Sequence, residues 1–217
     1  MVATPPLRSL QRAQIRGVGT VFLRLRPLLV APAVLTSWVL LWPNAARSQS
    51  LAVTAVSGSL LAFFAIEAAI ARRREVDERW LLRSLVVTLL GLLVAAFGSG
   101  ALASPYVPLL FAPAVTAFAA FGRSRASAMM FALLVAGVLA LAAVPEGVPF
   151  PPLSTDLRRA MVAVTIVLCA ALLRVSVAGL SDAHAEAGAA LDRLRAELLA
   201  GASERAVAVE SIGAKVA

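Results

Sequence analysis

Long apolar runs recur along this chain of 217 residues, separated by short segments rich in arginine or proline. A run of about 18 or more apolar residues is long enough to cross the hydrocarbon core of a bilayer as a helix. Hydrophobic residues make up 60% of the sequence and charged residues 15%, whereas a soluble domain averages about 45–50% and about 25%. The sequence therefore predicts an all-α, polytopic membrane protein whose first partner is the lipid bilayer.

Six membrane spans are expected from the positions of the apolar runs. They cover approximately residues 22–42, 51–71, 83–102, 106–121, 127–144 and 157–180. Pro105, Pro108 and Pro113 predict that the fourth span is kinked or unwound at its start. The third and fourth spans are barely long enough to cross separately, so a re-entrant hairpin in this region is the alternative.

The arginines predict the orientation of the spans. The net charge of +8 comes from 19 arginines and one lysine against 12 acidic residues. Twelve of the arginines lie in residues 1–26, 72–83 and 123–125, and three lie in the opposite loops. Because cytoplasmic loops carry an excess of basic residues, both termini are expected in the cytoplasm, with residues 1–20 as a basic cytoplasmic segment. This distribution argues against a nucleic-acid-binding face.

Few ionisable side chains fall within the expected spans. Arg24 and Arg26 lie near the cytoplasmic end of the first span, where long side chains can reach the interface. Glu67 is either a buried proton or ion site or a partner of Arg72 and its neighbours at the interface, and its position favours the second interpretation. Arg174, near the inner end of the last span, is expected to reach the interface. Glu67 and Arg174 are the candidate sensing residues.

Sequence motifs for catalysis and for cofactor binding are missing. The chain contains no Walker loop, no GxSxG, no HExxH and no cysteine or histidine cluster with metal-ligand spacing. No catalytic residue, cofactor or metal site is therefore expected in this chain. The single cysteine, Cys169, is interpreted as a small packing residue, and the single histidine, His184, as a solvated helical residue.

The last span is expected to continue without a break into a cytoplasmic helical linker, residues 181–217. Asp156 is expected to cap the start of this span. In the linker, apolar residues follow heptad spacing with one additional four-residue step, which is typical of a weak coiled coil. The alternative is a solvated amphipathic tail without a partner. The residues predicted to form a dimer seam are Leu191, Leu194, Leu198, Val209, Ile212 and Val216.

The end of this linker, residues 203–217, resembles the run that leads into the dimerisation and phosphoacceptor helix of bacterial sensor histidine kinases. In that family, a segment of the type Glu-Ser-Ile-Gly-Ala-Lys-Val-Ala is followed by the phosphorylated histidine and then glutamate. Here that segment is residues 210–217, and the sequence ends where the histidine would come next. His184 does not match the phosphoacceptor's context. The resemblance implies the sensor half of a homodimeric two-component protein of the inner (plasma) membrane.

The function expected is that of a sensor and signal-transmission module. A conformational change in the membrane domain would pass through the last span to a dimeric cytoplasmic helix. The resemblance further implies that a protein-histidine kinase portion, with ATP as its cofactor and a response regulator as its partner, belongs to the full-length relative. The alternatives are a small transporter or channel-like protein, which needs polar groups converging within the membrane, and a membrane anchor for a different output domain.

Overall fold

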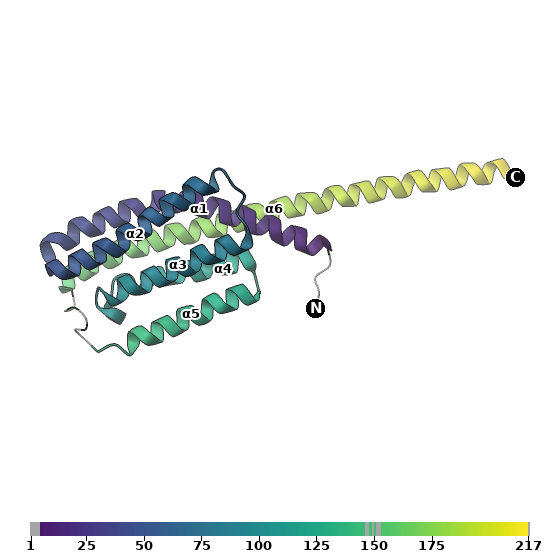
Figure 1. Cartoon of the computed structure of the whole chain (residues 1–217). Coiled ribbons are helices and arrows are strands. Elements are labelled where there is room, and N and C mark those ends of the chain that lie inside the picture. Colours follow the sequence, from purple (N-terminus) through teal and green to yellow (C-terminus); the bar gives the residue numbers. More distant parts are fainter. Residues whose placement is uncertain (1–4, 146–147, 149, 151–152, 217) are drawn as a thin grey trace.

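The computed structural model describes residues 5–145, 148, 150 and 153–216, and all secondary structure in these ranges is helical. Within these ranges, six α-helices and two short 3₁₀ helices follow one another (Figure 1). Their bounds are α1 Pro5–Asn44, α2 Arg47–Ala71, α3 Glu78–Phe97, η1 Ala101–Ala103, η2 Val107–Leu110, α4 Phe111–Phe121, α5 Arg125–Ala142 and α6 Thr155–Val216.

Five of the helical segments are long and apolar enough to cross a membrane. They are Gly17–Asn44, Arg47–Ala71, Glu78–Phe97, Arg125–Ala142 and Thr155–Ser181. The apolar segment Val107–Phe121, where the fourth of six spans was expected, is shorter than these five. The all-helical class predicted from the sequence is confirmed, and five helices have the dimensions of membrane spans.

Large apolar side chains cover the outside of the bundle. Leu28, Val39, Ile66, Leu139 and Val167 are each at least 60% exposed. Soluble monomers rarely present extended apolar patches to water, whereas a bilayer provides an apolar surrounding for them. The apolar outer surface therefore agrees with a multi-pass arrangement.

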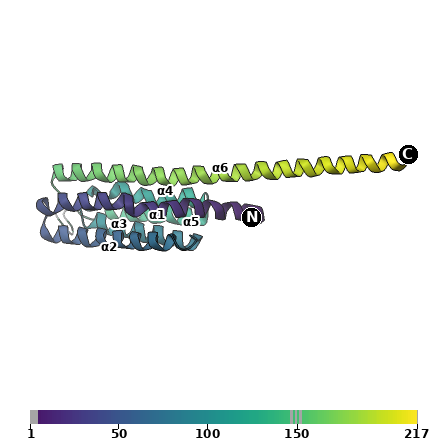
Figure 2. The same ribbon diagram turned by 90° about the horizontal axis from the view of Figure 1, so that it is seen from above.

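Successive helices run back and forth along one elongated bundle (Figure 1). The first part of α1 and the last part of α6 leave the bundle at the same end, and α6 continues far beyond it as a single rod (Figure 2). The contact between α1 and α6 is the most extensive between any two helices. The first and last helices thus form one packed pair at the end from which the tail extends.

Local sequence signals set the helix ends around α3 and α5. The Asp77 carboxylate accepts a hydrogen bond from the Trp80 backbone N–H at 2.7 Å, so α3 begins at Glu78, before the expected start at Arg83. Ser124 and Ser127 form a reciprocal capping box at the start of α5. In contrast, α1 runs without interruption through Pro27 and Pro32.

The connection between α3 and α4 is irregular, as the three prolines predicted. Gly100 and Ala101 have positive φ angles of 115° and 52°, which reverse the chain after α3. The hydroxyls of Ser99 and Ser104 lie 2.6 Å apart, and the Ser104 hydroxyl also accepts a hydrogen bond from the Tyr106 backbone N–H at 3.1 Å. Two 3₁₀ turns then replace regular α-helix until Phe111. The expected unwinding at the start of this segment is confirmed.

The long helix α6 begins at Thr155 and spans 62 residues. The Arg158 backbone N–H donates to the Ser154 carbonyl at 2.9 Å, which places Ser154 at the position before the helix. Asp156, the residue expected to cap the helix, lies instead within the first turn, where a negative charge is favourable to the helix dipole. Its carboxylate is exposed and lies 3.9 Å from Arg159 Nη1.

Candidate functional site

A buried ion pair joins the first two helices near the end of the bundle that carries the tail. Arg26 of α1 is 1% exposed and Glu67 of α2 is 5% exposed. Arg26 Nη2 lies 2.5 Å from Glu67 Oε2. The interpretation that Glu67 pairs with Arg72 at the interface is therefore wrong, and so is the placement of Arg26 at the interface. Of the two interpretations, the one in which Glu67 is buried agrees with the structure, and Arg26 is its counter-ion.

Three side chains of α3 hydrogen-bond to this pair. Arg26 donates to Thr88 Oγ1 at 3.0 Å and to Ser84 Oγ at 3.1 Å. Ser84 Oγ donates to Glu67 Oε2 at 2.6 Å, and Trp80 Nε1 donates to Glu67 Oε1 at 3.1 Å. Both carboxylate oxygens thus accept hydrogen bonds from α3. We refer to Arg26, Glu67, Trp80, Ser84 and Thr88 as the polar centre.

Two aromatic rings flank the guanidinium of the polar centre. The Arg26 Cζ lies 3.8 Å from the centroid of the Phe64 ring and 5.2 Å from that of the Phe22 ring. A cation over the face of an aromatic ring is attracted by the ring quadrupole, most strongly where water is excluded. The rings therefore stabilise the charge of Arg26 where water cannot.

The polar centre contains one positive and one negative side chain, and it links α1, α2 and α3. Removing two charges from water costs several kcal/mol per ion, and the cost is offset only if the ions pair well and their remaining donors and acceptors are satisfied. Ser84 is the seventh residue of α3, so the centre lies about 9 Å along the helix from its first residue. This arrangement fixes the relative positions of three helices and holds no spare base or nucleophile.

An apolar cavity of about 60 Å³ adjoins the polar centre inside the bundle. Helix α1 contributes one face to it, and α2, α3, the segment after η1, α4 and α6 contribute the rest. The α1 residues in its wall recur at three- and four-residue intervals over about 22 Å of helix. They are Phe22, Arg26, Val30, Ala33, Val34 and Ser37.

Two polar groups in the wall of this cavity are not fully hydrogen-bonded. Arg26 Nε and the Tyr106 hydroxyl are buried and have no hydrogen-bond partner among the described residues. The Ser37 hydroxyl interacts with the Tyr106 hydroxyl but lies at hydrogen-bond geometry only with the Ala33 carbonyl, to which it donates at 2.8 Å. Buried polar groups are usually satisfied, so each exception calls for a specific explanation.

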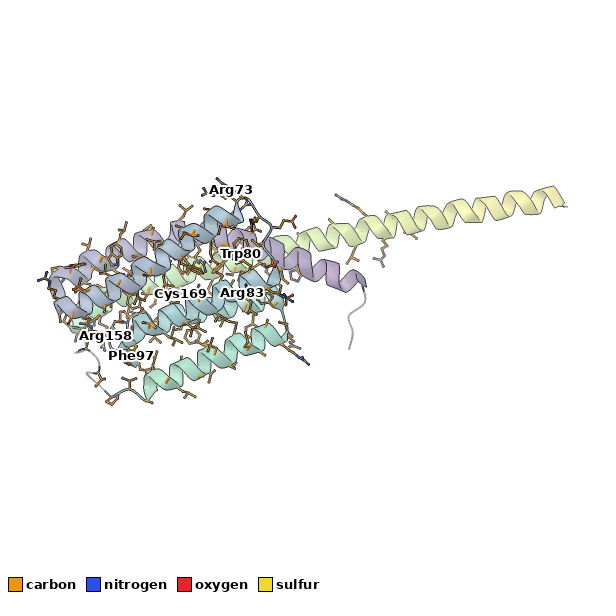
Figure 3. The ribbon with its side chains drawn as sticks, in the orientation of Figure 1. Arg73, Trp80, Arg83, Phe97, Arg158 and Cys169 are labelled. Atoms are coloured by element: carbon orange, nitrogen blue, oxygen red, sulfur yellow. The ribbon has the colours of Figure 1, made fainter. Side chains whose placement is uncertain are left out.

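One face of α6 is bonded to the irregular segment that begins α4. Thr165 Oγ1 donates to the Pro105 carbonyl at 2.7 Å, and Cys169 Sγ lies 3.3 Å from the Pro108 carbonyl. The hydroxyls of Thr116 and Ser176 lie 2.8 Å apart. Because Pro108 has no N–H to donate, the Pro105 carbonyl is free to accept from the Thr165 hydroxyl. Figure 3 shows Cys169 in the middle of the bundle. Cys169 thus packs within the core and also makes a polar contact.

The structure brings together only part of the residue set predicted from the sequence. Glu67 lies in the polar centre, whereas Arg174 is exposed on α6 and outside it. Leu191 of the predicted seam is 58% exposed. The other five seam positions lie outside the part of the chain whose side chains the structure describes. They are Leu194, Leu198, Val209, Ile212 and Val216.

The sequence interpretation assigned neither Arg26 nor Tyr106 to the site, and it also missed the three α3 residues Trp80, Ser84 and Thr88. A signal for Arg26 exists: Arg24 and Arg26 are two residues apart, so they point about 200° apart around the helix. Only one of them can face outward. Arg24 is that residue, since its Nη2 donates to the Ala71 carbonyl at the end of α2 at 3.0 Å. Tyr106 has no comparable signal, because its position depends on the turn after α3.

Among the residues that the structure describes, no group of three or more histidine, cysteine, aspartate or glutamate side chains could hold a metal ion. Comparison of the chain with protein families, with characterised proteins and with solved structures finds no match. The polar centre, the cavity and α6 are therefore the features of the molecule that bear on its function.

Proposed function

We propose that this chain is a membrane sensor module that passes a conformational change in its bundle to its C-terminal helix. The observation that carries the proposal is the continuity of α6. One helix contains residues in the cavity wall, such as Thr165 and Leu172, and runs without a break to Val216. A rearrangement of the bundle around α6 would therefore move the tail as well.

The mechanism needs two packings of α6 that are close in free energy. Its contacts in the bundle include three side chains that bond to residues of the segment 105–116. A stimulus that binds one packing better than the other shifts the population toward it. Rotation or sliding of α6 against α1 and α4 would then change the face that the tail presents.

The tail is proposed to form a homodimer. Leu191 and Leu199 are 58% and 68% exposed on the part of α6 beyond the bundle. The heptad-like spacing of residues 191–216 and the resemblance of residues 203–217 to the linker of sensor histidine kinases both support pairing with a second copy. On this proposal the output is a kinase portion that uses ATP and a response regulator. Another output domain attached to the same helix is the alternative.

The proposed topology has six crossings, with both termini in the cytoplasm. Figure 3 places Arg73, Trp80 and Arg83 at the end of the bundle from which the tail extends, and Phe97 and Arg158 at the other end. The excess of arginine at the tail end supports its cytoplasmic location. The segment 107–121 would be the sixth crossing, with its prolines accommodated by contacts to α6.

Cysteine labelling in membranes tests this topology. In a Cys169→Ala background, Arg123→Cys and Ser181→Cys are expected to react with a membrane-impermeant maleimide from the cytoplasmic side. Asn44→Cys is expected to react from the opposite side. Arg123 follows the segment 107–121, so its labelling on the side of Asn44 would mean that this segment does not cross.

Disulfide cross-linking tests the dimeric tail. In the same background, Leu194→Cys and Ile212→Cys are expected to give cross-linked dimers in oxidised membranes, since both positions lie on the predicted seam. Ala196→Cys is the matched control, because it lies about 200° around the helix from Leu194. Equal cross-linking at Ala196 and Leu194, or none at both seam positions, would contradict a parallel dimer with this seam.

The polar centre gives one reason to consider a small transporter as the second candidate. Transport sites need polar groups within the membrane, and Arg26 and Glu67 supply them. The centre is nevertheless hydrogen-bonded internally, and the adjoining cavity is apolar. Solute or proton flux in proteoliposomes that is lost in Glu67→Gln would favour transport over sensing.

A further inference from the structure

We propose that the cavity between the polar centre and Tyr106 binds a small uncharged solute with a hydrogen-bond acceptor, of the class of short-chain alcohols and ketones. No feature of the proposed function assigns a ligand to this cavity. The role of the solute as a stimulus rests on the proposed function, whereas its binding does not.

The size of the cavity limits the solute to a few non-hydrogen atoms. The volume is about 60 Å³. Sites for larger ligands are typically about 300–1,000 Å³. An alcohol or ketone of about four non-hydrogen atoms is therefore the class that fits without opening the bundle.

The charges around the cavity favour an uncharged solute. Arg26 is the charged side chain in the cavity wall, and Glu67 already pairs with it. An anion or a cation would add an unbalanced charge to a buried site, which is costly. The wall is otherwise formed almost entirely by apolar groups, which favour the carbon atoms of the solute.

The two buried polar groups without partners favour a solute that carries a hydrogen-bond acceptor. Arg26 Nε carries a hydrogen and can only donate, and the Tyr106 hydroxyl can donate. Tyr106 is 6% exposed, so lipid or bulk water does not reach its side chain freely. Neither donor is open to the cavity in this packing, so binding needs a small shift of the Arg26 or Tyr106 side chain. The oxygen of an alcohol or ketone would then satisfy that donor, whereas a hydrocarbon would satisfy neither.

Occupancy of the cavity would act directly on α6. Leu168 and Leu172 of α6 lie in the wall, together with Thr165, which donates to the Pro105 carbonyl one residue before Tyr106. A solute bonded to Tyr106 and packed against these leucines contacts both sides of the interface between α6 and the irregular segment. Such a solute distinguishes two packings of α6 because it fits only one of them.

Fluorine NMR with 2-fluoroethanol tests the binding on the full chain in lipid nanodiscs. An alcohol of four non-hydrogen atoms reaches a dissociation constant no tighter than roughly 40 µM, so the titration covers the micromolar to millimolar range. A saturable change in the fluorine signal is expected, in addition to the linear change from partition into lipid. 2-Butanone should displace the saturable component.

Two variants of the wall and one control make the result specific. Ala112→Val fills the cavity and should abolish the saturable component, because Ala112 is 2% exposed and lies in the wall. Tyr106→Phe keeps the shape but removes the donor, and should weaken binding by up to about tenfold. Ala140→Val, on the exposed side of α5, should bind as the wild type does.

The proposal is overturned if no saturable component exists, or if it is unchanged in both Ala112→Val and Tyr106→Phe. Since Tyr106→Phe adds no atoms, it keeps the test valid even if Ala112→Val folds poorly. A saturable component that appears in nanodiscs without protein would identify lipid as its source and would also overturn the proposal. Spin-label distances between the tails measure the signalling role separately. Binding without a change in these distances removes the sensor function for this ligand and leaves the site intact.

Discussion

Replacing Glu67 by alanine is expected to destabilise the bundle by about 3–5 kcal/mol, because it leaves Arg26 buried without its counter-ion. Arg26 is 1% exposed and enclosed by the Phe22 and Phe64 rings, so water cannot easily replace the carboxylate. The Trp80 indole and the Ser84 hydroxyl lose their acceptor in the same variant. The measurement is the free energy of unfolding in detergent, followed by the fluorescence of the three tryptophans.

Removing both charges should cost much less than removing one. The double variant Arg26→Met with Glu67→Leu replaces the ion pair by apolar side chains of similar length, a change that is often neutral in buried sites. Glu78→Ala is the matched single-charge control, because Glu78 is exposed in the first turn of α3. It should change stability by about 1 kcal/mol or less. If Glu67→Ala behaves as Glu78→Ala does, the polar centre does not hold the bundle together.

Replacing Gly179 by valine is expected to push α6 away from α1 at the point where the tail leaves the bundle. A Cβ atom at Gly179 would lie 3.1 Å from the Val18 Cα atom. Backbone atoms of a packed helix cannot move aside as a flexible side chain can, so the helices must separate. We expect a loss of stability of about 1–3 kcal/mol and a changed cross-linking pattern in the Leu194→Cys tail.

Gly188 provides the matched control for this substitution on the same helix. A Cβ atom there meets nothing within 4 Å. Since valine has a higher helix propensity than glycine, Gly188→Val should leave the bundle unchanged and slightly favour the helix. Equal effects of Gly179→Val and Gly188→Val on stability and on cross-linking would show that the close contact with Val18 does not position α6.

The sequence was sufficient to predict the helices but not their ends, and the sixth crossing that it predicts for residues 106–121 stays a prediction. Apolar run length and the charged or proline-rich breaks between runs are local properties, and they located the helices correctly. The start of α3 depended on the cap formed by Asp77, which lies within a charged loop. The unwound start of the segment 107–121 followed from its prolines, because proline has no N–H for the helix ladder.

The polar centre could not be predicted from residues that are neighbours in the sequence. Glu67 is one of few acids in an apolar run, but the arginines that follow it in the sequence, such as Arg72, indicate the wrong partner. The choice between Arg72 and Arg26 depends on how α1 packs against α2, which involves residues 41 positions apart. The cavity depends on even more distant contacts, such as that of Thr165 with Pro105.

Because α6 is continuous, a small change in its tilt at the bundle produces a large displacement at its far end. About 35 of its 62 residues lie beyond Ser181, and at about 1.5 Å per residue this part is about 50 Å long. A tilt of about 5° at the exit from the bundle would therefore displace the far end by about 4–5 Å, close to the rise of one helical turn. In the proposed dimer, a tilt of this size near Gly179 would change which residues meet at the far end of the two tails.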